Sequence, residues 1–325
     1  MKRISSKEIA SQLGKAEKVA IFGHVSPDID CYGSAIGLKM GLECVGKEAF
    51  VYLSDKMPYN LIFLNNYGGF SEETDVKEVD LAVVLDCSSV NRVNSGEILK
   101  SYKKSGVKVI LIDHHLPGNL LDFTDFGWQD ETISSVSEMI LAILRDLHAA
   151  IHKGIATYLL AGIEGDTSSF QNQNTTQSSF EASAYLMSKG ARFGSIINNT
   201  INSKRNVNLI KLYGLVLERI VYNKKYKTAT TYITLEDLKK YGLEEDASYG
   251  EMINFLNAID GIKMIVLISE RPNNELKVSL RTRDEHINVQ ILASALGGGG
   301  HAKASGFSLT GQITTEQGRI KISCV

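Results

Sequence analysis

The sequence predicts an α/β protein in which a parallel-sheet domain is joined by a helical connector to a smaller α/β domain. Three observations carry this prediction. The chain has 325 residues, which corresponds to about two domains at roughly 150 residues each. Short apolar runs without polar alternation indicate strands that are buried on both faces of a parallel sheet. Helical patterns separate these runs, and such alternation is typical of a doubly wound sheet.

The first domain is expected over residues 1–185. Its strands are predicted at four runs rich in Val, Ile and Phe, namely Lys18–Gly23, Ala49–Leu53, Leu81–Leu85 and Val107–Ile112. Its helices are predicted at Tyr32–Val45, Asn91–Ser105, Ser134–Ala150 and His152–Ile163. The regular alternation of predicted strands and helices indicates that these residues form the doubly wound domain.

Helical patterns continue through residues 186–222, which we interpret as a connector between the domains. The second domain is expected over residues 223–325. Its strands are predicted at Ala229–Ile233, Lys263–Ser269 and Leu276–Arg281, and its helices at Tyr249–Ile259 and Val289–Leu296. The glycine run Gly297–Gly300 is expected to end this segment.

The composition is that of a folded protein. Apolar residues make up 43% and charged residues 22%, with only four prolines, which excludes a disordered or low-complexity chain. The four cysteines lack the spacing of a disulfide framework or a CxxC pair. The N-terminus lacks the apolar stretch of a signal peptide, and no apolar run is long enough to span a membrane. We therefore expect a soluble, cytoplasmic protein without a membrane partner.

The net charge of −2 hides two opposed halves. Residues 1–185 carry 16 basic and 24 acidic side chains, a net of −8, and the remainder carries 19 and 13, a net of +6. Ordinary scatter between domains is one interpretation, and a charged partner is the other. The chain has no continuous basic tract. This argues against binding of long nucleic acid, which depends on extended electrostatic contacts, but it does not exclude binding of a short polyanion.

Polar side chains gather where the predicted strands end. Ligands bind outside the carboxyl ends of the strands in open α/β sheets. Three of the four polar clusters are therefore expected to meet in one crevice, and the fourth, which follows a helical run, to fold over it. The clusters are His24 with Asp28 and Asp30, then Asp86, then Asp113 with His114 and His115, and finally Asp166.

The residue types of these clusters indicate a metal site. Imidazoles and carboxylates, with no Cys among the candidate ligands, suit Mn²⁺ or Mg²⁺. Two such ions, typically ~3.5–4 Å apart, can generate hydroxide near neutral pH and stabilise a phosphoryl oxygen. Each cluster alone also has a structural interpretation, with Asp28 and Asp30 capping a helix and His114 and His115 forming a surface turn. Their recurrence at successive strand ends favours the metal site.

These segments resemble the ordered signatures of the DHH phosphoesterase superfamily. The matching segments are HVSPDID followed by YGSAIGL, then LDCSS, LIDHH, GDTSSF and GGGGHAKASGF, and they span residues 24–307. The resemblance is strongest to NrnA-type nanoRNases and 3′-phosphoadenosine 5′-phosphate phosphatases. It implies a DHH catalytic domain, a DHH-associated substrate domain, and a Mn²⁺-dependent phosphohydrolase that acts on short oligoribonucleotides or small nucleotides. Two Mn²⁺ ions are implied, with Mg²⁺ or Co²⁺ as substitutes.

The resemblance also implies a role for each site residue. One ion would be held by His24, Asp28 and Asp86, and the second by Asp30, Asp86, His114 and Asp166, with Asp86 bridging. His115 would face the scissile phosphate as a hydrogen-bond donor or general acid. Asp113 would orient its neighbours, as metal sites commonly require, although a carboxylate that only caps a turn remains an alternative. Cys31 and Cys87 adjoin two of the ligands, where a thiol brings sensitivity to oxidation.

The C-terminal glycine run and nearby arginines suggest a second binding element. Consecutive glycines allow positive φ and close approach of backbone N–H groups to an anion. Arginines at alternating strand positions should share one sheet face, and a guanidinium matches phosphate geometry. Without the resemblance, a flexible linker and solvated arginines are the favoured explanation of the pattern. With it, the substrate's terminal phosphate is assigned to Arg281 and His301, with Gly298, Gly299, Gly300 and Arg283 as further contacts.

Two other functions stay open at this point. A cyclic or linear dinucleotide phosphodiesterase, of the cyclic di-AMP type, belongs to the same superfamily. A nucleotide-binding regulatory module without catalysis belongs to a different class, and it is expected to lack one or more metal ligands, whereas the ligand set in this sequence is intact. The expected partners are short RNA oligonucleotides or small nucleotides and not long duplexes, and a homodimer is left open.

Overall fold

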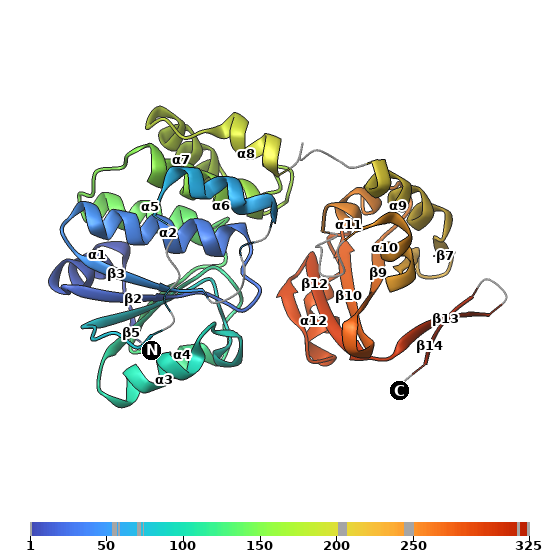
Figure 1. Cartoon of the computed structure of the whole chain (residues 1–325), viewed down its shortest axis with the longest axis horizontal. Helices are drawn as coiled ribbons and strands as arrows, with labels where there is room; N and C mark the ends of the chain where they lie inside the picture. Colours follow the sequence, from blue (N-terminus) through green and yellow to red (C-terminus); the bar gives the residue numbers. More distant parts are fainter. Residues whose placement is uncertain are drawn as a thin grey trace. The chain divides into compact units, whose positions relative to one another are not determined.

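The computed structural model describes residues 2–53, 57, 59–69, 73, 75–200, 207–243, 250–316 and 319–323. The chain divides into two compact units, unit 1 (Met1–Ser203) and unit 2 (Lys204–Val325), both drawn in Figure 1. The helices expected to form a separate connector over residues 186–222 are divided between these units. Helix α8 (Phe193–Asn199) belongs to unit 1, and helix α9 (Val207–Glu218) belongs to unit 2.

Unit 1 contains a six-stranded parallel sheet with the strand order β1-β6-β5-β4-β2-β3. The strands are β1 (Lys2–Arg3), β2 (Lys18–Phe22), β3 (Glu48–Tyr52), β4 (Leu81–Leu85), β5 (Lys108–Asp113) and β6 (Phe126–Gln129). The prediction of a parallel sheet is confirmed, and the four expected strands are β2 to β5. The sequence did not reveal β1 and β6, which are too short to form an apolar run.

Helices cover both faces of this sheet. They are α1 (Ser6–Lys15), α2 (Ile29–Cys44), α3 (Gly96–Lys104), α4 (Leu120–Phe123), α5 (Val136–Asp146), α6 (Lys153–Asp166), α7 (Gln177–Ser188) and α8, with short 3₁₀ segments at Tyr59–Tyr67 and Val90–Arg92. Figure 1 shows α1, α2, α5 and α6 on one side of the sheet and α3 and α4 on the other. Along β4, Leu81, Val83 and Leu85 enter one core, while Ala82 and Val84 enter the other. The strand is apolar throughout because both of its faces are buried.

The strand order reverses between β2 and β4. The chain leaves β2 toward β3 on one side and returns to β4 on the other side. In open α/β sheets, ligands bind at the carboxyl ends of the strands where the order reverses in this way. Helices α2 and α6 pack closely together. The glycine at position 33 permits this approach, since a Cβ there would lie only 2.6 Å from the carbonyl oxygen of Tyr158.

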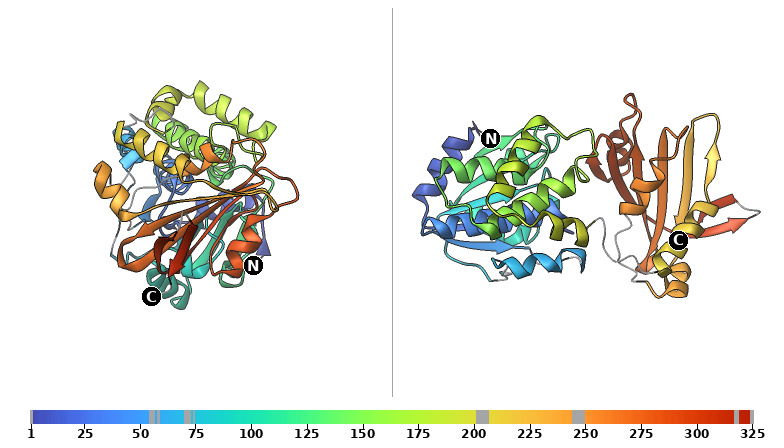
Figure 2. Two further views of the ribbon diagram at one scale, coloured as in Figure 1. Left: turned by 90° about the vertical axis from the view of Figure 1, so that its right-hand side faces the viewer. Right: turned by 90° about the horizontal axis from the view of Figure 1, so that it is seen from above.

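Unit 2 contains a mixed six-stranded sheet with the order β11-β12-β10-β9-β8-β7, in which β8 and β9 are parallel and the other pairs are antiparallel. The strands are β7 (Val221–Asn223), β8 (Thr228–Ile233), β9 (Met264–Arg271), β10 (Glu275–Thr282), β11 (Gly299–His301) and β12 (Ala304–Thr310), and a separate hairpin joins β13 (Gln312–Glu316) to β14 (Arg319–Ser323). The helices are α9, α10 (Leu235–Tyr241), α11 (Gly250–Leu256) and α12 (Val289–Ala295), with a 3₁₀ turn at Pro272–Asn274. Figure 2 shows helices on both faces of this sheet.

Two expectations for unit 2 are wrong. The glycine run does not end the folded segment, because β11 contains part of it and β12 follows and inserts between β11 and β10. Strand β12 has the sequence ASGFSLT, whose small and polar residues gave no apolar run. Arg283 was expected to alternate with Arg281 along one strand. It lies one residue beyond the end of β10 and is therefore not part of that strand.

No helix in the part of the chain that the structure describes is both long and apolar enough to cross a bilayer.

Candidate functional site

The predicted site residues of unit 1 lie at the carboxyl edge of the parallel sheet. His24 follows β2, Asp86 follows β4, Asp113 ends β5, and Asp166 ends α6. Asp86 has a φ of 56°, a left-handed conformation that Asp adopts more readily than most residues. Its N–H donates to the carbonyl of Ile112 on the neighbouring strand at 3.1 Å. Such backbone outliers concentrate at functional sites, where the surrounding structure holds them.

Asp86 lies among three imidazoles. Its Oδ2 is 3.6 Å from His24 Nε2, and its Oδ1 is 3.5 Å from both His114 Nε2 and His115 Nδ1. These separations are longer than good hydrogen bonds. The Asp86 side chain is 2% exposed, and its Oδ1 has no hydrogen-bond partner among the described residues. A buried carboxylate oxygen surrounded by imidazoles at this spacing fits a position that bridges metal ions.

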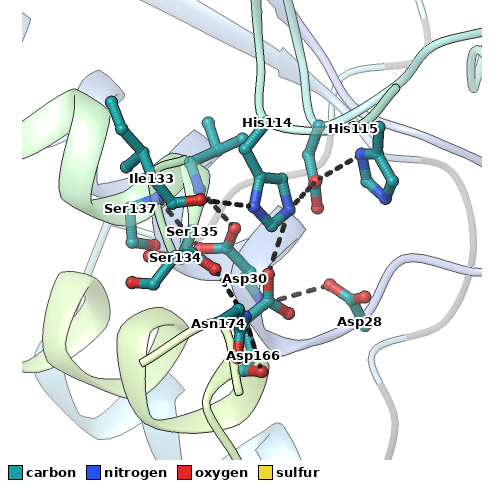
Figure 3. Close-up of polar contacts among 12 residues, drawn as sticks. Asp28, Asp30, His114, His115, Ile133, Ser134, Ser135, Ser137, Asp166 and Asn174 are labelled. Atoms are coloured by element: carbon teal, nitrogen blue, oxygen red, sulfur yellow. Dashed lines mark hydrogen bonds and ion pairs between the residues drawn. The ribbon is translucent and has the colours of Figure 1, made fainter. Parts of the chain in front are cut away.

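A second group of donors surrounds His114, as Figure 3 shows. His114 Nε2 is 3.1 Å from Asp166 Oδ2, and its Nδ1 is 3.2 Å from the carbonyl oxygen of Ile133. Asp30 is bound to the start of α5, where its carboxylate accepts N–H bonds from Val136 at 2.7 Å and Ser137 at 2.9 Å. One donor atom from each of Asp30, His114 and Asp166 lies within 4.8 Å of the others. Backbone contacts therefore orient this group before any ligand binds.

Asp28 has the capping role that the sequence left open, and it also lies beside His24. It is the N-cap of α2, and its Oδ1 accepts N–H bonds from Asp30 at 3.1 Å and Cys31 at 3.0 Å. The same oxygen is 3.8 Å from His24 Nε2, and the side chain is 57% exposed. The capping contact therefore holds the carboxylate near His24 and leaves much of it open to a ligand.

Cys31 was not among the ligands predicted from the sequence, and the structure places it in the cluster. Donor atoms of His24, Cys31 and Asp86 all lie within 4.8 Å of one another, and the three side chains are buried. The signal was present in the sequence, because Cys31 directly follows Asp30 in the first turn of α2.

His115 and Asp113 form a close pair beside the cluster. His115 Nδ1 is 2.8 Å from Asp113 Oδ1. Asp113 is fully buried, and its Oδ2 has no hydrogen-bond partner among the described residues. The His115 side chain is 20% exposed, compared with 3% for His114. Asp113 therefore orients the imidazole that is the more open of the two.

The electrostatics of the cluster favour a bound cation. Burial opposes charge on His114, but Asp166 and Asp86 raise its pKa well above the usual value. Burial and the charges of Asp166 and Asp86 raise the pKa of Asp30 well above its usual value. Burial raises the pKa of Asp166 to about 6, although His114 partly offsets the shift. So many buried carboxylates are costly to ionise together, and divalent cations would offset that cost.

The loop after α6 holds Asp166 in place. Ser168, Ser169 and Phe170 have φ values of 46°, 56° and 64°, a left-handed turn of three residues. The side-chain amides of Asn172 and Asn174 then donate to the carbonyl oxygen of Asp166 at 2.9 and 3.2 Å. Neither asparagine was predicted from the sequence, because two amides in a polar loop carry no signal until the loop folds back.

In unit 2, Arg281 and His301 lie in one row of the sheet. Ala304 of β12 pairs with Arg281 on one side and with His301 on the other. Directly paired residues point to the same face, so both side chains share that face. Arg281 Nε donates to Asn254 Oδ1 at 3.0 Å, and one terminal nitrogen donates to its neighbour's carbonyl, that of Leu280, at 3.0 Å.

The glycine run has a structural use. Gly297 has a φ of 80° at the end of α12. The N–H of Gly298 donates to the carbonyl of Ala293 at 2.8 Å. It therefore caps α12, whereas the sequence had predicted that this N–H would contact an anion. A Cβ on Gly298 would also overlap the carbonyl oxygen of Gly306, whereas one on Gly299 would meet nothing within 4 Å.

Comparison with known proteins gives consistent matches over both units. Residues 18–163 match the DHH family, N-terminal domain, and residues 231–319 match the DHHA1 domain. The chain is 30% identical over 321 residues to the bifunctional oligoribonuclease and PAP phosphatase NrnA of Mycoplasma genitalium, covering 95% of this chain and 94% of the relative. It is 25% identical to the cyclic-di-AMP phosphodiesterase PdeA of Listeria monocytogenes, covering 99% of this chain and 49% of that protein. A solved exopolyphosphatase-related protein from Bacteroides fragilis shares the fold, with a TM-score of 0.83, 24% identity and coverage of 94% and 92%.

Proposed function

Since this chain belongs to the DHH family and is a phosphoesterase, we propose that it degrades short oligoribonucleotides to mononucleotides and dephosphorylates 3′-phosphoadenosine 5′-phosphate. The observation that carries the proposal is the position of Asp86 between two sets of metal-binding side chains at the carboxyl edge of the sheet. The relative from Mycoplasma genitalium, which is named for both activities, supports the choice of substrates.

The donor set suits two divalent ions, Mn²⁺ first, with Mg²⁺ or Co²⁺ as substitutes. His24, Asp28 and Asp86 would hold one ion, and Asp30, Asp86, His114 and Asp166 the other. When bound, such ions supply an activated water and neutralise charge on the phosphate. The orphaned, buried Oδ1 of Asp86 supports this assignment.

His115 and Asp113 would handle the proton. Asp113 accepts from His115 Nδ1. Burial opposes charge on His115, but Asp113 raises its pKa above the usual value. The protonated ring carries its second proton on Nε2, from which it would donate a proton or hydrogen bond to the oxygen that leaves the phosphate. Asp113 thus acts through His115 and not on the substrate itself.

Arg281 and His301 of unit 2 would bind another phosphate of the substrate. Each lies one strand away from Ala304, and strands are spaced by about 4.8 Å, so the backbone positions of the two residues are roughly 10 Å apart on one face. Gly299, Gly300 and Arg283 adjoin this row. Gly298 is not proposed as a substrate contact, because its N–H caps α12. Binding of a second phosphate group at a fixed position would favour short substrates.

The test is hydrolysis by the Mn²⁺-loaded full chain. It should release mononucleotides from di- to pentaribonucleotides and phosphate from 3′-phosphoadenosine 5′-phosphate, and Asp86→Ala should abolish both activities. Asp122→Ala, which removes an exposed carboxylate on α4, serves as the matched control and should leave them unchanged. Retained activity of Asp86→Ala with unchanged metal content would contradict the mechanism.

A cyclic dinucleotide phosphodiesterase is the second candidate. It is supported by the identity with PdeA across nearly all of this chain. Turnover of cyclic di-AMP should be compared with turnover of its linear product under identical conditions. Faster cleavage of the linear dinucleotide supports the first proposal, and faster opening of the ring supports the second.

A further inference from the structure

The two donor groups beside Asp86 differ in chemistry. Asp30, His114 and Asp166 offer only oxygen and nitrogen. The group around His24 also contains the thiol of Cys31, and its three members are buried. Nitrogen and oxygen donors suit Mn²⁺ and Mg²⁺, whereas thiolate selects softer ions such as Zn²⁺.

We propose that Cys31 Sγ is a direct metal ligand, together with His24 and Asp86, and that it makes the two subsites unequal. Thiolate-binding ions such as Zn²⁺ or Co²⁺ compete better with Mn²⁺ at the subsite with Cys31 than at the subsite with Asp30, His114 and Asp166. This inference rests on the proposed function, because it assigns a ligand to one of the two ions proposed there.

Local structure fixes the thiol at this place. The N–H of Cys31 donates to Asp28 Oδ1 at 3.0 Å, which holds it in the first turn of α2. Its Sγ lies against Gly23, where a Cβ would overlap the sulfur. The glycine before His24 therefore leaves room for Cys31 beside the end of β2.

The three donor atoms lie near enough to one another to share an ion after small side-chain rotations. Ligand atoms at about 2.0–2.3 Å from one ion lie at most about 4.6 Å apart. Donor atoms of His24, Cys31 and Asp86 lie within 4.8 Å of one another. A second observation concerns the oxygen of Asp86 that faces this group, because the buried Oδ2 lies 3.6 Å from His24 Nε2, which is longer than a good hydrogen bond and leaves room for an ion between the two atoms.

Cys87 provides a comparison within the same chain. It is also buried and directly follows Asp86, but its Sγ donates to the carbonyl of Ser89 at 3.2 Å. Cys87 thus has an ordinary partner and belongs to none of the candidate metal groups formed by the described residues. When Cys31 binds an ion, its sulfur donates an electron pair to the metal and its proton leaves to solvent, so no oxidant is required.

The experiment uses the full chain loaded with Co²⁺ and absorption spectroscopy. Wild type and Cys87→Ser should show a near-ultraviolet sulfur-to-cobalt charge-transfer band beside the visible bands of bound Co²⁺. Cys31→Ser should keep the visible bands and lose the charge-transfer band. Its preference for Zn²⁺ over Mn²⁺, measured by competition, should fall by at least about tenfold, a loss that even outer-shell substitutions cause.

A second measurement requires no variant. X-ray absorption at the zinc edge of the wild-type protein should show a sulfur neighbour at about 2.3 Å. Bound Zn²⁺ without sulfur, or a charge-transfer band that persists in Cys31→Ser, would overturn the role of Cys31 and leave the proposed function standing. Failure of the wild type to bind any of these ions would overturn the metal centre itself.

Discussion

The carboxyl edge of the sheet in unit 1 and the Arg281–His301 row in unit 2 are built in opposite ways. In unit 1, buried carboxylates and imidazoles contact one another, and several also bind backbone groups. In unit 2, the row lies on a largely antiparallel sheet, and His301 is exposed. A preorganised, buried cluster suits chemistry, since misplaced groups are costly there. A row that combines an exposed imidazole with a half-buried guanidinium suits recognition, where each contact adds affinity. Losses in unit 1 should therefore lower kcat, and losses in unit 2 should raise KM.

The largest difference between the two regions is expected at His115. His115→Ala should lower kcat by about 10²–10⁴-fold, the usual contribution of a positioned proton donor, with KM and metal content little changed. Steady-state kinetics on a dinucleotide, together with metal analysis, would check this. His286→Ala removes an exposed imidazole in unit 2 and should have no effect. An unchanged kcat in His115→Ala would remove the proton donor from the mechanism.

Much of unit 1 was predictable because its strands carry unusually plain signals. Strands β2, β4 and β5 read as unbroken apolar runs since both faces are buried, and a polar group follows each one. Parallel topology then brings those groups to one edge. The proposed role of each residue at that edge stays a prediction.

The features that the sequence did not reveal depend on contacts made only in three dimensions. Asn172 and Asn174 support Asp166 after the chain reverses through a left-handed turn. The position of Cys31 beside Asp86 depends on the pairing of β2 with β4. In unit 2, β12 has small and polar residues, so its insertion beside β10 followed no visible pattern.

A smaller effect is expected at Arg281. Arg281→Ala should raise KM about 10–100-fold, because a hydrogen bond to a charged group contributes about 1.5–3 kcal/mol, while kcat stays within a few-fold. Asn254→Ala removes only the side-chain partner of Arg281 and should raise KM less. Kinetics on a dinucleotide would measure both variants. A fall in kcat as large as that of His115→Ala, with KM unchanged, would erase the distinction between the two regions.

The smallest effect separates packing from binding within the glycine run. Gly298→Ala places a Cβ on the carbonyl oxygen of Gly306, and overpacking of this kind typically costs about 1–3 kcal/mol. The thermal midpoint of the full chain should therefore fall. Gly299→Ala is the matched control, because its Cβ meets nothing within 4 Å, and its midpoint should stay unchanged. If Gly298→Ala instead raised KM without lowering the midpoint, that glycine would serve the substrate and not the end of α12. The exposed region of unit 2 would then share the precise positioning that distinguishes unit 1.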